Sequence, residues 1–187
     1  MKKSLIFALA LSAVLFSCGG KTDSHEGHDM DHATGQESET PATTASENKA
    51  TTAIIDSYLA VKDALVADDQ AATASKSAAL VTALKEFDAS AGTEELKSLQ
   101  QEASSSAEKL ASEVLAAQRE NFQALSVTLT EFLKITGTDR TLYQQHCPMY
   151  NQNTGGIWLS ASEEIKNPLF GSKMLTCGRV QETLVSL

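Results

Sequence analysis

Cysteine, methionine and histidine, which bind soft metal ions, are confined to a few short stretches of this sequence. Cys147 and Met149 flank Pro148, while Met174 and Cys177 are three residues apart. A proline disfavours the helical region at the preceding residue, so we expect the first triplet to be extended. Its thiol and thioether would then point to the same side of the chain. A helical or tight turn would bring the second pair together.

The four sulfur atoms could converge on one ion. Thiolate and thioether ligands select Cu(I), or the chemically similar Ag(I), whereas Zn(II) prefers cysteine, histidine and carboxylate. His146 is a candidate additional ligand, although in an extended chain it would point away from Cys147 and Met149. We therefore expect a copper(I) or silver site formed by Cys147, Met149, Met174 and Cys177.

A disulfide between Cys147 and Cys177 is the alternative, because two cysteines in an oxidising compartment often pair. It would stabilise the fold by about 3–4 kcal/mol in the loop-entropy model, and it would remove both thiolates as ligands. The methionines and His146, which a disulfide does not need, favour the metal. Nothing in the sequence supports a redox switch between the two states. The cysteines form no C-x-x-C pair with an activating neighbour, which argues against a thiol oxidoreductase.

A second group of ligand types lies near the N-terminus, where residues 25–32 read HEGHDMDH. His25, His28, Met30 and His32 could wrap one metal ion without a preformed fold, and the acidic neighbours would raise the local cation concentration. Such a flexible site must be ordered upon binding, so it should hold metal loosely. Chance histidines in a solvated polar tract are the alternative.

The N-terminus is typical of a secreted protein. Two lysines precede an apolar run at residues 5–16, which is shorter than the roughly 20 residues that span a bilayer but fits a signal peptide. The run leads into Leu15-Phe16-Ser17-Cys18-Gly19, which resembles a bacterial lipobox. We expect a lipoprotein signal peptide at 1–17 and lipidation at Cys18. The mature protein would be held at the inner or outer membrane by lipid alone, facing the periplasm or the cell surface. An ordinary signal peptide with a chance cysteine is the alternative.

The composition excludes several functions. The 187 residues include 15 Lys and Arg against 24 Asp and Glu, a formal net charge of −9. This balance argues against nucleic acid as a partner, because phosphate binding needs a basic face. Neither a glycine-rich phosphate loop nor a Ser/His/Asp pattern stands out, so we expect a binding protein rather than an enzyme.

Residues 18–47 are polar without an apolar period, which predicts a disordered linker.

Residues 48–136 contain no proline and are rich in good helix formers. Apolar residues three and four apart predict four helices. The stripes are Ile54, Tyr58, Val61 and Leu65; Leu80, Leu84 and Phe87; Leu96, Leu99, Ala103, Ala107 and Leu110; and Leu115, Gln118, Phe122, Leu125, Leu129 and Phe132. Asp68-Asp69 and Thr93 should start the second and third helices, and Gly137 should end the fourth.

We therefore expect a mainly α fold, an up-down four-helix bundle with a small irregular or β C-terminal segment, over residues 48–187. The alanine-rich third stripe would bury little, so that side could pack on the C-terminal segment or on a partner. Residues 155–159 indicate a turn entering a short strand, 167–171 a turn, and 180–187 a final strand or helix. Trp158 is expected to be a packing anchor.

Several C-terminal motifs carry a family resemblance. They are HCPM at 146–149, GIWLS at 156–160, EIKNPLFG at 164–171 and MLTCG at 174–178, and residues 58–65 look like the same domain's first helix. Over about residues 50–185 the chain resembles a domain of unknown function. That domain occurs in Bacteroidota lipoproteins and at the C-terminus of some periplasmic adaptors of Cus-type copper/silver efflux pumps.

The Cys-Pro-Met triplet is also similar to that of short heavy-metal-binding domains attached to copper transporters, although their second cysteine-containing loop differs. The resemblance implies heavy-metal handling in the cell envelope, with a periplasmic efflux adaptor as a candidate partner. It brings no catalytic residues. We expect a copper(I) or silver carrier or efflux accessory without turnover of its own.

Overall fold

The computed structural model describes residues 43–112 and 114–186. The predicted signal peptide at 1–17, the lipidation site Cys18 and the tract with His25, His28, Met30 and His32 lie outside these residues. The first helix begins at Thr43, so it extends back into the segment predicted as a linker.

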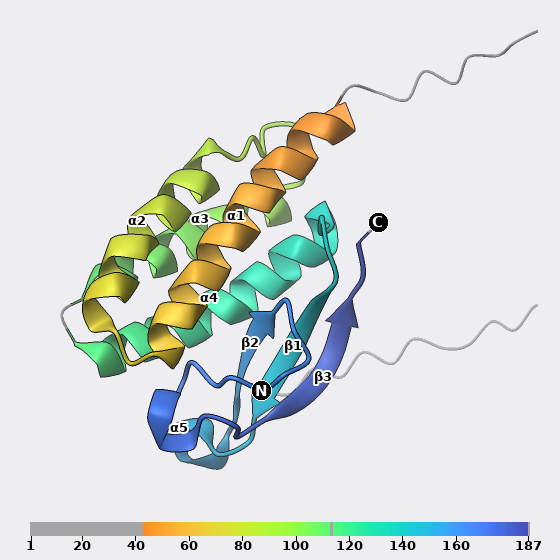
Figure 1. Cartoon of the computed structure of the whole chain (residues 1–187). Helices are drawn as coiled ribbons and strands as arrows, with labels where there is room; N and C mark the ends of the chain where they lie inside the picture. Colours follow the sequence, from red (N-terminus) through yellow and green to blue (C-terminus); the bar gives the residue numbers. More distant parts are fainter. Residues whose placement is uncertain (1–42, 113, 187) are drawn as a thin grey trace, which may run out of the picture. The chain divides into compact units, whose positions relative to one another are not determined.

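Four long helices form the body of the described chain (Figure 1). They are α1 (Thr43–Val66), α2 (Gln70–Glu86), α3 (Glu94–Glu108) and α4 (Leu115–Thr136), and the short 3₁₀ helix η1 (Lys109–Ala111) precedes α4. Each helix packs on the next along the chain, and α4 also contacts α1, which closes the bundle. The mainly helical prediction is confirmed.

Polar caps set the helix boundaries where the sequence predicts them. The side chain of Asp69 accepts a hydrogen bond from the Ala72 N–H at 2.8 Å, and that of Thr93 accepts from Leu96 at 3.1 Å. Gly137 ends α4 with φ 79°, a conformation that a glycine adopts without the strain of a Cβ. These caps supply partners for backbone groups that the helix ends leave unpaired.

The predicted apolar stripes meet in one hydrophobic core. With the exception of the half-buried Leu99 and Leu115, their apolar members lie buried inside the bundle. Tyr58 and Phe122 stack with ring centroids 4.9 Å apart, and Phe87 meets Phe132 edge-on at 4.9 Å.

The C-terminal segment forms a three-stranded antiparallel sheet of β1 (Leu142–Cys147), β2 (Gly156–Ser160) and β3 (Arg179–Leu184). The strand order is β2-β1-β3, with a bulge between Gln144 and Gln145 on the β3 side. The turn α5 (Tyr150–Asn153) lies between β1 and β2, and η2 (Gly171–Met174) precedes β3. The sequence pattern predicted β2 and left β3 open between strand and helix.

The sheet lies beside the bundle, with β2 against α4 and η2 close to α1 (Figure 1). The helix α3 instead packs mainly on α2 and α4. The expectation that the alanine-rich side of α3 would pack on the C-terminal segment is therefore wrong. Trp158 is fully buried, as predicted for a packing anchor. Within the described ranges, no helix has the length and apolar character needed to cross a membrane.

Candidate functional site

The two cysteines of the C-terminal segment meet in space. The Sγ atoms of Cys147 and Cys177 lie 2.6 Å apart, and both residues are free cysteines. Cys147 is 0% exposed, whereas Cys177 is only partly buried. The meeting of two sulfur atoms from distant loops is the geometry that both the metal prediction and the disulfide alternative require.

Cys147 is held by the end of the central strand. It is the last residue of β1 and lies opposite Gly156 of β2. A Cβ on Gly156 would come within 2.6 Å of a Leu169 methyl and 2.7 Å of the Tyr150 ring. The absence of a side chain at residue 156 therefore lets the C-terminal loop pack tightly beside Cys147.

Cys177 is positioned by the fully buried side chain of Asn167. The Asn167 amide donates to the Cys177 carbonyl at 2.8 Å, and its oxygen accepts from the N–H groups of Leu169 at 2.8 Å and Phe170 at 3.2 Å. The Cys177 N–H donates to the Met174 carbonyl at 3.0 Å, so the pair lies across a tight turn, one of the two arrangements expected from the sequence. One asparagine thus fixes both ends of the loop that carries Cys177.

A polar cluster attaches this loop to the bundle. Asp68, in the turn between α1 and α2, pairs with Arg119 of α4 and accepts from the Ser172 hydroxyl at 2.5 Å and the Ser172 N–H at 3.1 Å. Arg119 also donates to the Pro168 carbonyl at 3.1 Å. The Ser172 hydroxyl, assisted by Arg119, holds the pKa of Asp68 below its ordinary value. Gly171, at φ 57°, leaves room for this ion pair, because a Cβ there would overlap both partners.

The outer edge of β2 is joined to the helices. The Tyr58 hydroxyl accepts from the Leu159 N–H at 3.0 Å and bonds to the Ser126 hydroxyl at 2.6 Å. The Gln123 side chain accepts from the Ile157 N–H at 2.7 Å. Burial raises the pKa of Tyr58, so its hydroxyl stays protonated at neutral pH. These contacts fix the hairpin whose other strand ends in Cys147.

The electrostatic surroundings favour the protonated thiol at Cys177. Burial, followed by the hydrogen bond and charge interaction with Cys147, raises its pKa, while a hydrogen bond with the Met149 backbone opposes the shift. A metal that binds the thiolate must therefore displace a proton from this residue.

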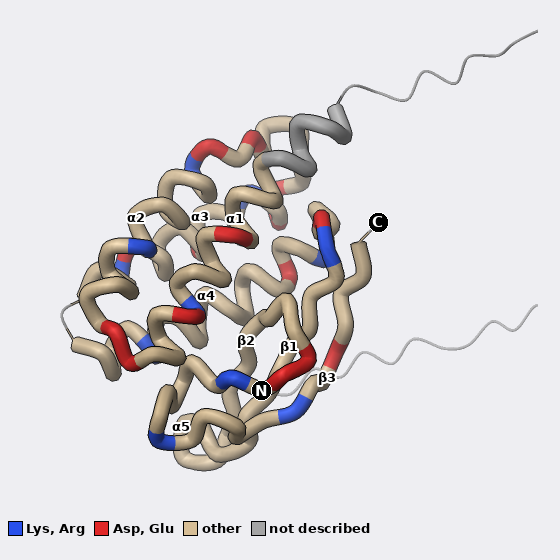
Figure 2. The backbone as a smooth tube through the Cα atoms, viewed as in Figure 1, with Lys and Arg blue, Asp and Glu red and all other residues tan. Residues whose placement is uncertain are grey.

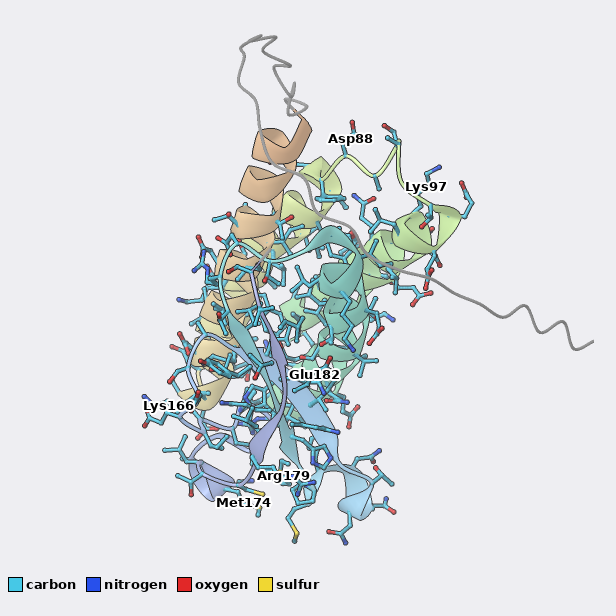
Figure 3. The ribbon with its side chains drawn as sticks, turned by 90° about the vertical axis from the view of Figure 1, so that its right-hand side faces the viewer. Asp88, Lys97, Lys166, Met174, Arg179 and Glu182 are labelled. Carbon is cyan, nitrogen blue, oxygen red and sulfur yellow. The ribbon has the colours of Figure 1, made fainter. Side chains whose placement is uncertain are left out.

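The two methionines that neighbour the cysteines in the chain differ in backbone conformation and in exposure. Met149 has φ −82° and ψ −13°, so it sits in a turn, and the prediction that the Cys147-Pro148-Met149 triplet is fully extended is wrong at Met149. Its side chain is 51% exposed. Met174 ends η2 and is partly buried. Figure 3 shows Met174 and Arg179 at one end of the described chain, with Asp88 and Lys97 at the other.

His146 is not part of a conventional metal cluster. Side chains alternate along a strand, which directs His146 away from its neighbour Cys147. Its imidazole lies against Gly155, where a Cβ would come within 2.4 Å of Nε2, and its buried Nδ1 has no hydrogen-bond partner in the described part of the chain. Across the same residues, no group of three or more His, Cys, Asp or Glu side chains could hold a metal ion. The candidate site is thus a pair of thiols, with a methionine close to each cysteine in the chain.

The residues that position the site could not be recognised from the sequence. Asn167 was assigned only to a turn and Asp68 only to a helix boundary, and Arg119 and Gln123 carried no recognisable signal. Their roles arise from contacts between segments far apart in the sequence, for example the ion pair between Asp68 and Arg119.

A family model matches most of the helical body. Residues 54–141 match the model described as "Protein of unknown function (DUF3347)". The match confirms the resemblance to a domain of unknown function. It ends just before β1, so Cys147 and Cys177 lie beyond it. No curated protein and no solved structure matches the chain.

Proposed function

We propose that this chain, whose helical body matches a family model of unknown function, is an envelope protein that binds Cu(I) or Ag(I) and carries the ion or assists its efflux. Cys147 and Cys177 would be the principal ligands, with Met149 and Met174 as auxiliary thioethers. The protein would act by binding and transfer, without turnover of its own.

The observation that carries this proposal is the contact between the two free thiols, 2.6 Å apart. Both come from segments held by extensive hydrogen bonds, β1 on one side and the Asn167 loop on the other. Two thiols already held together lose little further freedom when a metal joins them, which favours tight binding.

Metal binding would spread the two sulfur atoms. An ion bonded to each sulfur at about 2.3 Å, the length of a zinc–thiolate bond, holds them about 4 Å apart. The partly exposed Cys177 side chain, rather than the buried Cys147, would supply this movement.

The ligand types favour a soft monovalent ion. Thiolates and thioethers select Cu(I) and Ag(I), and the described residues bring together no cluster of three or more histidine, cysteine and carboxylate side chains of the kind that zinc prefers. Met149 is half-exposed beside the thiol pair and could join a bound ion by a side-chain rotation. We assign His146 no more than an outer role, because its strand position directs it away from Cys147.

The membrane anchor and the histidine tract complete the proposal from the sequence alone. Lipidation at Cys18 would keep the protein at the membrane, and His25, His28, Met30 and His32 would collect ions loosely and pass them on.

The described Lys and Arg residues are interspersed with Asp and Glu (Figure 2). This distribution supports the expectation that nucleic acid is not a partner, because phosphate binding needs a basic face.

Competition titration with a chromophoric Cu(I) chelator tests the metal site. We would use the reduced full chain with Cys18→Ser, so that the third thiol does not contribute. Combining Cys147→Ser with Met174→Leu should abolish the tight site and leave only weak binding by the histidine tract. Full Cu(I) affinity in that variant would exclude the proposed site.

A matched control is available beside the site. Leu175 is 40% exposed in the same loop and has no ligand atom in its side chain. Leu175→Ala should therefore leave the affinity unchanged, and an equal loss in this variant would attribute the effect to loop disruption.

A disulfide-stapled interaction module is the second candidate function. The distance between the two sulfurs is also short enough for a disulfide to form after a small adjustment. In this alternative the bundle docks on an efflux adaptor or another envelope protein, and metal is incidental. Thiol counting in protein isolated from cells separates the two functions, because absence of free Cys147 and Cys177 thiols even under copper load favours the module.

A further inference from the structure

We propose that the Cys147–Cys177 pair undergoes thiol–disulfide exchange with external disulfides, with Cys177 as the sulfur that reacts first and Cys147 as the sulfur that resolves the intermediate. Closure of the pair would remove both principal metal ligands. This second consequence rests on the proposed function, whereas the exchange reaction does not.

Different exposure of the two sulfurs sets the order of the reaction. Cys147 is 0% exposed at the end of the central strand, so an external molecule cannot reach it in the folded protein. Cys177 is only partly buried, in the loop that follows η2. Thiol–disulfide exchange requires direct attack of one sulfur on another, so accessibility decides which cysteine reacts with an outside disulfide.

The close contact of the sulfurs favours the second step. A mixed disulfide on Cys177 would leave the Cys147 sulfur beside it, because the two Sγ atoms are 2.6 Å apart in the free protein. Neither backbone has to travel, since Cys147 is fixed in the β1 ladder and Asn167 holds the Cys177 carbonyl at 2.8 Å. We therefore expect the mixed disulfide to be short-lived.

The reaction balances without a metal or other cofactor. The Cys177 thiol loses its proton and attacks one sulfur of the external disulfide, which breaks that disulfide and releases one thiol. The Cys147 thiol then loses its proton and attacks the Cys177 sulfur, which forms the Cys147–Cys177 bond and releases the second thiol. The protein dithiol is oxidised, and the external disulfide is reduced to two thiols.

Reaction of the reduced full chain with oxidised glutathione tests the order of attack. All proteins carry Cys18→Ser, and intact mass is measured after rapid acid quenching. The parent should close to the internal disulfide without accumulating a glutathione adduct. Cys147→Ser should accumulate one adduct on Cys177, whereas Cys177→Ser should react at least about tenfold more slowly, because its remaining thiol needs local opening.

The same reaction in concentrated urea is the internal control. With the fold removed, Cys147→Ser and Cys177→Ser should form adducts at similar rates. Equal rates in the folded state, faster modification of Cys147 than of Cys177, or a stable adduct on the parent would each overturn the proposal. Circular dichroism identifies a variant that has not folded, in which case Cys147→Ala or Cys177→Ala replaces the serine variant.

Silver titration of the oxidised and reduced parent tests the link to metal binding. The disulfide form should lose the tight Ag(I) site, and reduction should restore it. If the reduced protein binds no silver, the proposed function fails while the exchange result stands. If both forms bind silver equally, disulfide closure does not control the site, and that part of the proposal is wrong.

Discussion

Asn167 shows how a single buried side chain can determine the position of a functional residue. The hydrogen bonds of its side-chain amide with Cys177, Leu169 and Phe170 account for the path of the whole loop. Asn167→Ala would leave these backbone groups without partners in a buried region. We expect the free energy of unfolding to fall by about 2–4 kcal/mol, measured by urea denaturation.

The half-buried Asn121 on α4 provides the comparison for this substitution. Its amide only bonds back to the Ala117 carbonyl one helical turn earlier. Asn121→Ala should change stability by no more than about 0.5 kcal/mol. A loss for Asn167→Ala as small as this would contradict the role given to Asn167.

Asp68 should make part of the stability depend on pH. Its pKa is lowered in the folded protein, so its contribution is complete above the unfolded value of about 3.9 and is lost as pH falls through that value toward the folded pKa. Asp68→Asn is a suitable variant because asparagine tolerates the positive φ of 58° at this residue.

The wild type should be more stable than Asp68→Asn at pH 7, and the difference should shrink below about pH 4. Urea denaturation at several pH values measures it. A stability difference that stays constant from neutral to acidic pH would show that the ion pair with Arg119 and the Ser172 contact do not depend on the Asp68 charge.

At this scale, the sequence predicted which residues come together better than it predicted the directions of their side chains. The clustering of Cys147 and Cys177 followed from their isolation from the helical body. The direction of Met149 did not, because Pro148 is followed by a turn rather than by extended chain. Three residues of that turn, Asn151, Gln152 and Asn153, have positive φ, which is uncommon without glycine and gives no reliable local signal.

Among the structural elements, β2 depends on contacts from distant helices. The Tyr58 hydroxyl from α1 accepts the Leu159 N–H on the outer edge of this strand. Tyr58→Phe would leave that buried N–H unpaired and should cost about 1–3 kcal/mol. The free energy of opening that amide hydrogen exchange reports at Leu159 should fall by a comparable amount. A larger fall there than elsewhere in β2 would locate the effect at this hydrogen bond.

Tyr150→Phe is the matched control, because this half-buried tyrosine packs edge-on against Phe170 and its ring remains after the change. Its stability should stay within about 0.5 kcal/mol of wild type. If Tyr58→Phe behaves like Tyr150→Phe, the Leu159 N–H does not need the tyrosine hydroxyl.

Helices were predictable at this scale, whereas the sheet was predictable only in part. The spacing of Phe122, Leu125 and Leu129, with Gly137 after them, specifies α4 locally. The strands β1 and β3 are short, and β3 is exposed except at Leu184, so they lack a clear alternating pattern. The pairing of β2 and β3 on either side of β1 follows from tertiary contacts that no local pattern carries.

The whole described chain has one continuous hydrophobic core. The cluster that contains Tyr58 and Phe132 also contains Leu142, Trp158 and Leu169 of the C-terminal segment. The boundary of the family match at residue 141 is therefore not a folding boundary. A chain that ends at residue 140 should lose the cooperative urea transition of the full chain, because it exposes the helix surfaces that the sheet covers.

Truncation after Leu184 is the control for this prediction. Val185 is 64% exposed, so its removal with the last residues should leave the transition almost unchanged. A cooperative transition of similar midpoint in the chain ending at 140 would show that the bundle folds independently and that the C-terminal segment is only attached to it.

At the scale of the whole protein, the mainly helical fold with a small C-terminal sheet was predictable from composition and periodicity. The side on which the sheet packs was not. The alanine-rich α3 suggested a side that packs on the C-terminal segment or on a partner, but α2 and α4 cover it, because small residues let helices approach closely. Cys147 belongs to the single core that the helices and the sheet share.

X-ray absorption at the copper edge tests the central claim most directly. The reduced full chain with Cys18→Ser would be loaded with less than one equivalent of Cu(I). We predict a first shell of sulfur only, at about 2.3 Å, that disappears when Cys147→Ser and Cys177→Ser are combined. A shell of nitrogen or oxygen, or a sulfur shell unchanged in that double variant, would contradict the account.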